Sequence, residues 1–411
     1  MRIRLIYDCL FPGPVGRAER WSVRLGEARP GDAGRRAVRD GGRAGARPTR
    51  CELESGYRVS LVEPDDFEVA ALIDEMGAGL TNAPAIYRPG EFWTGLVAAN
   101  LEMLKSEGIG NFKRTVSNNY YNWHFTWRRD PQIRRAMEGW VKRPTLAPLV
   151  NRLTGPASGL RTTVVDQPFA LSRAAAWRYK FFVGAIWDGA RRDDPSNLTS
   201  RLSEPTIGNP IAVRHRGRLI SQDLANSIIE FNYAARSGVM RDGCRVGELG
   251  AGYGRLGYVF AQACEGTYCI FDIPPALAVA QWYLAKVLGQ ARIVPYSRLA
   301  DFASREPQLG PGKVAFFTPD QLELFPNGWF DCTQTISTLP EMPANQATHY
   351  LELLAAKSRR ALFLKQWRSW ANPGDGSDLK EEHYVLEPPW QLAERREDPV
   401  QPAFFNQIWL R

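Results

Sequence analysis

The sequence is poor in the residues that build metal sites and disulfide frameworks. It holds six cysteines and four histidines among 411 residues. No two cysteines have the Cys-x-x-Cys spacing of zinc sites or thioredoxin-like redox sites. Four cysteines fall in or beside expected strands and helices, so we interpret them as reduced core thiols: Cys244, Cys264, Cys269 and Cys332. No Asp or His spacing is typical of a metal site, and we expect none.

Long apolar runs are also absent. No segment approaches the roughly 18 consecutive apolar residues that a membrane-spanning helix needs. Met1–Leu10 is partly apolar, but neither a long hydrophobic region nor a clean cleavage site follows it, which argues against a signal peptide. We therefore expect a cytoplasmic protein without an integral membrane segment.

Net positive charge is almost absent outside the first 50 residues. These hold twelve Arg, no Lys and five acidic residues, so they carry +7 of the net charge of +8. The remainder is nearly neutral, which argues against a broad nucleic-acid-binding surface. We expect no nucleic-acid partner.

The chain divides into three expected parts. Residues 1–60 form an extension rich in Arg and Gly, whose composition predicts disorder. It is either a tail for an anionic partner or, as we favour, a dispensable extension or a start codon assigned too early. Residues 61–240 are mainly helical and form a cap or substrate region. Residues 241–411 form a nucleotide-binding domain.

The stretch from Cys244 to Gly257 organises the second half of the chain. A short apolar segment ends at Glu248-Leu249, three glycines follow at alternating positions (Gly250, Gly252 and Gly254), and a helical pattern begins after them. This predicts a strand, a tight turn and a helix, in which a ligand lies against bare backbone at the helix N-terminus.

Three interpretations of this loop are open: either of two cofactors, or no ligand. The form E-x-G-x-G-x-G is typical of S-adenosylmethionine (SAM) loops in class I methyltransferases. The spacing Gly252-x-Gly254-x-x-Gly257 also satisfies the dinucleotide fingerprint. A glycine-rich turn without a ligand is the third interpretation. Glu248 favours SAM, because an acid is unfavourable beside a pyrophosphate and suits a ligand that carries an ammonium and a sulfonium.

Further acids follow the next strands. Asp272 closes Thr267–Asp272, and we expect it to bind ribose hydroxyls as a bidentate acceptor. Asp320 follows the strand Val314–Phe317, and we expect it to meet the adenine amino group. Glu248 would orient the amino end of SAM, and the three glycines would pass under its methionine and ribose portions.

The remaining pattern predicts an α/β fold of the class I methyltransferase type, a Rossmann-like sheet preceded by a mainly helical region. Strands are expected at 291–295, 314–317, 331–336 and 361–365. Two late strands, at Tyr384–Leu386 and Phe404–Leu410, match the antiparallel closing pair of that fold. A dinucleotide enzyme would more often start with its Rossmann half.

Upstream, the segment Asn111–Trp127 is dense in aromatic and amide side chains. Such side chains suit a sugar, because C–H groups stack on rings and hydroxyls meet amides. The alternative is the aromatic core of a subdomain, and the pattern leaves both open.

Several segments together resemble the sugar O-methyltransferases associated with bacterial surface-polysaccharide loci. The matching pieces are Phe92-Trp93, Asn111-Phe-Lys-Arg-Thr115, Asn119-Tyr-Tyr-Asn-Trp123, Gly208-Asn-Pro210, Ile220-Ser-Gln-Asp-Leu-Ala-Asn226, Gly247-Glu-Leu-Gly-Ala-Gly-Tyr-Gly254, Asp272-Ile-Pro-Pro275 and Glu341-Met342. The resemblance implies a SAM-dependent O-methyltransferase that acts on a sugar hydroxyl in polysaccharide biosynthesis. The acceptor would be a sugar, either linked to a nucleotide or lipid or within a glycan. It implies neither the exact substrate nor the catalytic base.

A sugar hydroxyl is a poor nucleophile, so a base should take its proton. The candidates are His383, in a loop after the fifth core strand, Glu341, at the end of the fourth, and Asp223, in the first turn of a helix capped by Ser221. Two other functions stay open: an NAD-dependent oxidoreductase, and a non-catalytic glycan-assembly protein on a methyltransferase fold.

Overall fold

The computed structural model of the chain describes residues 64–114, 173–210, 212–372, 374–401 and 403–411. Residues 60–411 group into one compact unit. The Arg/Gly-rich extension expected over residues 1–60 lies outside the described residues, as does most of the aromatic and amide segment, from residue 115 onward. The expected boundary at residue 240 stays a prediction.

Eight α-helices are described, and those expected after the glycine loop and after Ser221 are among them. They are α2 (Pro64–Thr81), α3 (Glu91–Glu107), α7 (Arg173–Ala190), α8 (Leu198–Arg201), α9 (Gln222–Ala235), α10 (Arg255–Ala263), α11 (Ala276–Leu288) and α12 (Ala344–Lys357). The expected cap of α9 is confirmed, because the Ser221 hydroxyl accepts the N–H of Leu224 at 3.0 Å.

The strands described form one large sheet and two small hairpins. The hairpins pair β1 (Val213–His215) with β2 (Arg218–Ile220), and β9 (Ser369–Ala371) with β10 (Asp378–Lys380). The sheet consists of β3 (Arg245–Leu249), β4 (Thr267–Phe271), β5 (Ile293–Val294), β6 (Val314–Phe317), β7 (Phe330–Ile336), β8 (Ser358–Trp367), β11 (Gln391–Glu397) and β12 (Phe404–Leu410).

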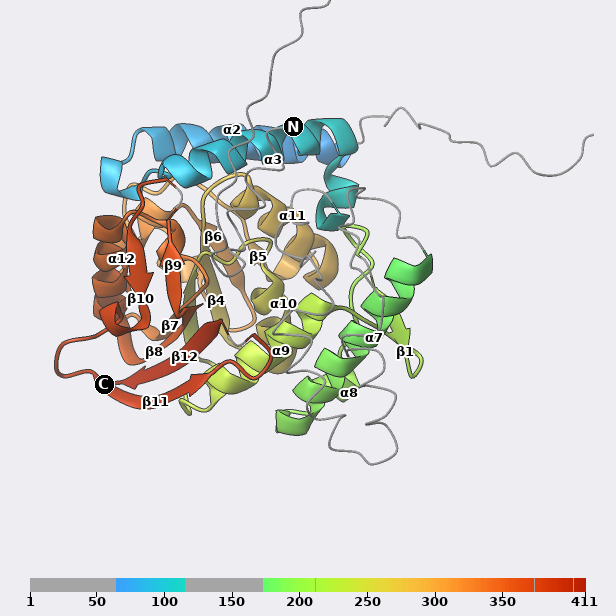
Figure 1. Cartoon of the computed structure of the whole chain (residues 1–411). Coiled ribbons are helices and arrows are strands. Elements are labelled where there is room, and N and C mark those ends of the chain that lie inside the picture. The colour runs from blue at the N-terminus through green and yellow to red at the C-terminus, as the bar shows by residue number, and fades with distance from the viewer. Residues whose placement is uncertain (1–63, 115–172, 211, 373, 402) are drawn as a thin grey trace, which may run out of the picture. The chain divides into compact units, whose positions relative to one another are not determined.

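The strand order decides the fold class. From one edge it runs β5-β6-β4-β3-β7-β8-β12-β11. Neighbours from β5 to β8 are parallel, whereas β12 is antiparallel to both β8 and β11. This is the expected class I methyltransferase arrangement, with β5 as an additional edge strand. Figure 1 shows the sheet with helices on its two faces.

The two faces of the sheet bury two separate apolar clusters, because successive side chains of a strand point to opposite faces. Val246, Tyr268 and Ile270 pack with side chains of α9, α10 and α11. Leu249, Phe271 and Phe317 pack with side chains of α12 on the other face. Cys244, Cys264, Cys269 and Cys332 are buried free thiols within these layers, as expected.

The prediction for the first strand of the closing pair was wrong. Tyr384–Leu386 is not a strand; the strand is β11, Gln391–Glu397. This edge strand is mostly exposed and polar, so it lacks the apolar alternation that marks strands in sequence. Tyr384 and Leu386 are buried against the core from a loop instead.

In the part of the chain that the structure describes, none of the helices combines the length and the apolar composition that crossing a membrane requires.

A cluster of buried charged side chains connects α9, α10 and β8. Glu230 of α9 pairs with Arg255 at the start of α10, and its Oε1 lies 2.8 Å from the Lys365 Nζ of β8. Lys365 Nζ also lies 3.0 Å from Asp398 Oδ2. Because each ion has partners of opposite charge, the cluster carries little net charge into the core.

We predict that Lys365→Met destabilises the fold by about 3–5 kcal/mol, because it leaves the carboxylates of Glu230 and Asp398 buried with too little positive charge. Urea denaturation followed by circular dichroism measures the loss. Lys380→Met is the matched control, since the Lys380 side chain is 49 % exposed and 3.9 Å from Asp378. Equal stability of the two variants would contradict the prediction.

Candidate functional site

The glycine loop between β3 and α10 contains two glycines that packing requires and one that faces open space. Gly250 and Gly254 have φ of +77° and +81°. A Cβ at Gly250 would overlap the Thr338 side chain, and one at Gly254 would lie 2.7 Å from Leu284 Cδ1. Gly252, with φ +58°, has no atom within 4 Å of its Cβ position. Gly252 is therefore the place where a ligand can reach bare backbone.

Asp272 holds this loop at the carboxyl end of the neighbouring strand. Its Oδ2 accepts the N–H of Gly252 at 2.7 Å, and its Oδ1 accepts the N–H of Ile273 at 2.7 Å. Burial raises the pKa of this carboxyl to about 7, although both N–H groups favour its charged form. Each oxygen keeps a lone pair for a further donor.

Glu248 lies inside the sheet below the loop, with 2 % of its surface exposed. Its Oε2 accepts the Tyr268 hydroxyl at 2.6 Å, and that hydroxyl accepts Nε2 of Gln334 at 2.6 Å. Burial raises the pKa of Glu248 to about 7. Its predicted role at the amino end of a cofactor stays a prediction.

Asp320 follows β6 in the 3₁₀ turn Pro319–Leu324. Its Oδ2 pairs with Arg298 Nη1 at 2.6 Å, whereas its buried Oδ1 has no hydrogen-bond partner among the described residues. A buried acceptor without a donor is costly, so this oxygen suits a donor group on a ligand.

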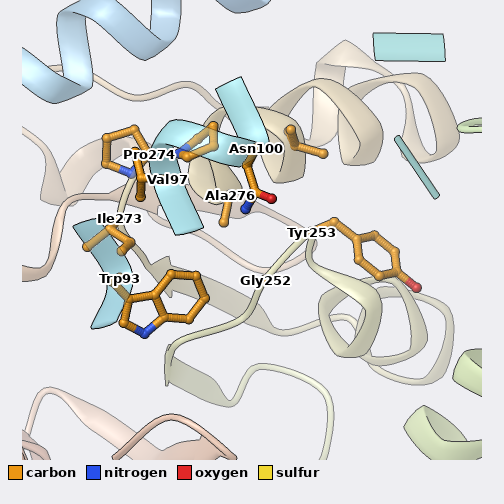
Figure 2. A pocket seen from close by; sticks show the side chains of 10 residues that line it. Trp93, Val97, Asn100, Gly252, Tyr253, Ile273, Pro274 and Ala276 are labelled. Atoms are coloured by element: carbon orange, nitrogen blue, oxygen red, sulfur yellow. The ribbon is translucent and has the colours of Figure 1, made fainter. Parts of the chain in front are cut away.

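Helix α3 forms a wall opposite Gly252 that the sequence analysis did not assign to the site. Trp93, Val97 and Asn100 occupy one helical face, and they line a pocket with Gly252 and Ile273. Figure 2 shows the side chain of Asn100 extending from α3 toward the strand end that carries Gly252. The spacing i, i+4, i+7 was a usable signal, but only the tertiary structure identifies what this face meets.

Glu341 stands at the end of the 3₁₀ turn Leu339–Glu341, just after β7. Burial, and then the charge of Asp272, raise the pKa of Glu341 to about 8, while a hydrogen bond from the Trp93 side chain favours its charged form. The charge of Asp272 thus acts on Glu341, and the hydrogen bond from Trp93 connects Glu341 to α3.

The other two base candidates have different surroundings. Asp223 is buried, accepts the Tyr253 hydroxyl at 3.0 Å, and has its pKa raised well above the usual range by burial. His383 is exposed, and its Nδ1 accepts the N–H of Lys380 at 3.1 Å within a short turn. None of the three base candidates, Glu341 included, is among the residues that line the pocket between α3 and Gly252. Their catalytic roles stay predictions.

From the aromatic and amide segment, the structure describes Asn111–Arg114. Lys113 is buried, with its Nζ 2.5 Å from Glu204 Oε1 and 4.4 Å from the centre of the Tyr283 ring. This part of the segment therefore has a packing role, and residues 115–127 lie outside the described residues. Among the described side chains, no group of three or more His, Cys, Asp or Glu is arranged to hold a metal ion.

No protein-family model matches the chain, and no curated protein matches it in sequence. Solved structures do resemble it. Magnesium protoporphyrin IX methyltransferase from Synechocystis PCC 6803, with bound SAM, is 18 % identical over 46 % of this chain and 82 % of that one, with a TM-score of 0.34. A SAM-dependent methyltransferase from Aquifex aeolicus is 13 % identical over 55 % of this chain and 97 % of that one, with a TM-score of 0.31.

A third similar structure is a SAM-dependent methyltransferase from Mesorhizobium loti, 11 % identical over 44 % of this chain and 98 % of that one, with a TM-score of 0.32. These likenesses concern the fold, and they are too distant to indicate what this chain binds. Its ligand has to be inferred from its own residues.

We predict that Gly250→Ala lowers the melting temperature more than Gly252→Ala does. At position 250 a methyl group meets Thr338 as well as a strained φ, whereas at position 252 only the φ is unfavourable, at about 1–2 kcal/mol. Differential scanning fluorimetry compares the two variants. A larger loss for Gly252→Ala would mean that the loop packs differently.

Proposed function

We propose that this chain is a SAM-dependent methyltransferase. The observation that carries the proposal is the open backbone at Gly252, held by Asp272 at the adjoining carboxyl ends of β3 and β4. Ligands of open α/β sheets bind at the carboxyl ends of the strands.

The residues around the loop fit the chemistry of SAM. Gly252 offers uncovered backbone, and Asp272 offers free lone pairs to two ribose hydroxyls. Asp320 has a buried oxygen without a donor, which suits the adenine amino group. Gly250, Gly254 and Glu248 would support this site from within the fold, with Glu248 nearest to the amino end.

A dinucleotide fits the same residues less well. A pyrophosphate needs N–H groups at the glycine loop. The N–H groups of Gly250, Gly252 and Gly254 already donate to Phe271 O, Asp272 Oδ2 and Ala251 O, at 2.9, 2.7 and 3.0 Å. The carboxylate of Asp272 at this position would also repel a phosphate.

When bound, SAM would supply a methyl group on a sulfonium, a good leaving group. The protein then has to orient the acceptor and remove its proton. Glu341 suits the second task, because a carboxyl with a pKa of about 8 binds a proton well and still ionises near neutral pH. We prefer it to His383 and Asp223, since it is coupled to Asp272 and contacts α3.

For the acceptor we propose a sugar hydroxyl, in bacterial surface polysaccharide or glycan biosynthesis. Support comes from the segments that resemble sugar O-methyltransferases. Two of these, Phe92-Trp93 and Glu341-Met342, contribute the side chains of Trp93 and Glu341 that share a hydrogen bond. An indole ring beside a base is a suitable surface for the C–H face of a sugar.

Calorimetric titration of the purified chain with SAM, S-adenosylhomocysteine and NAD tests the cofactor. We expect micromolar binding of the first two and none of NAD, with Asp272→Ala weakening SAM binding in a folded protein. Binding of NAD alone would overturn the proposal in favour of an oxidoreductase. SAM binding without turnover on any glycan extract would favour a non-catalytic glycan-assembly protein.

Glu341→Gln should lower kcat by about 10²–10⁴-fold, the usual contribution of a general base. In the wild type, kcat/KM should rise with pH through about 8, because Glu341 is active only when deprotonated. Stopped assays across pH 6–9 with radiolabelled SAM measure both effects. His383→Gln is the control; if it, and not Glu341→Gln, removes activity, the base is His383.

A further inference from the structure

Asn100 is a buried amide on an otherwise apolar helical face. It lies in the middle of α3, one turn from Val97 and two turns from Trp93, and 4 % of its surface is exposed. In the part of the chain that the structure describes, its Oδ1 has no hydrogen-bond partner. Leaving a buried polar group unpaired costs about 1–3 kcal/mol, which packing alone does not offset.

The amide faces the place where Asp272 meets the glycine loop. The pocket that Asn100 lines is bounded by Gly252, which bonds to Asp272, and by Ile273, which follows Asp272 in sequence. In Figure 2 the Asn100 side chain projects from α3 between Ala276 and Tyr253, above the label of Gly252. The unpaired group is therefore directed at the backbone that a ligand would cover.

The rest of the pocket limits the ligand's chemistry. The other lining side chains are uncharged and mainly apolar: Trp93, Val97, Tyr253, Ile273, Pro274, Pro275, Ala276 and Val279. None of the described residues that line it is basic, so a phosphate would lack a counter-charge from them. A neutral hydroxyl is the group that suits one amide in such surroundings.

We propose that α3 forms the outer wall of the cofactor site and that the Asn100 amide binds a ribose hydroxyl opposite Asp272. The inference rests on the proposed function. A hydroxyl donates one hydrogen bond and accepts others, whereas the carboxylate of Asp272 can only accept. The unpaired atom of Asn100 is its oxygen, and rotation of the amide about χ2 would direct its N–H group at the hydroxyl instead, so the two side chains together can meet both needs. The helical region thus contributes directly to cofactor recognition.

The test is titration of wild type and Asn100→Leu, a variant of similar volume, with S-adenosylhomocysteine and with analogues that lack the 2′- or the 3′-hydroxyl. We expect Asn100→Leu to bind S-adenosylhomocysteine about 3- to 10-fold more weakly, the loss of one hydrogen bond. It should match the wild type on one of the deoxy analogues. Thr94→Val, an exposed position on the same helix, should leave every affinity unchanged.

Two outcomes overturn only this inference: equal affinity of Asn100→Leu and wild type for S-adenosylhomocysteine, or an equal loss for all three ligands. If the wild type itself fails to bind, the proposed function fails with it. Should Asn100→Leu not fold, hydrogen exchange on the wild type decides the matter. Saturation with S-adenosylhomocysteine should slow amide exchange in α3, and unchanged exchange there would overturn the inference.

Discussion

The hydrogen bond from the Gly252 N–H to Asp272 is the contact on which the site depends. It ties the loop after β3 to the end of β4, so two elements that are separate in sequence present one surface. Gly250 and Gly254 allow the loop to reach this position, because each sits where a Cβ would collide with a neighbour. In the proposed function the carboxylate that fixes the loop also accepts the ribose hydroxyls, so folding and binding would use the same group.

Below that surface, buried charge connects the loop's helix to the rest of the domain. Arg255 begins α10 and pairs with Glu230, which pairs in turn with Lys365 of the sheet. Each of these charges would destabilise the fold if it were buried without a partner. The paired charges are compatible with few other arrangements of the helices and strands that carry them. The network therefore gives α10, and the glycine loop before it, a fixed position relative to β8. A ligand at Gly252 meets a preorganised backbone.

Helix α3 contributes side chains to the site that the sheet does not provide. Trp93 contacts Glu341, and Asn100 faces Gly252, so α3 supplies both an aromatic surface and an amide at the carboxyl ends of the strands. Burial and the charge of Asp272 raise the pKa of Glu341, although the hydrogen bond from Trp93 favours its charged form. The helical region that the sequence analysis assigned to a cap thus contributes side chains to the pocket at Gly252.

The amino-acid sequence by itself determined the parts whose signals are local. The glycine spacing, the acids that end strands and the Ser221 cap identified β3, α10, β4 and α9, because a turn, a strand end and a helix start each depend on a few neighbouring residues. The sequence pattern did not indicate the position of β11, since this exposed edge strand is stabilised by pairing with β12 and not by its own pattern. Only the tertiary structure decided that Asn100 and Trp93 face the loop, that Glu341 is coupled to Asp272, and that His383 lies on an exposed turn. Those relations depend on which segments, distant in sequence, pack together, and residue spacing does not predict that packing.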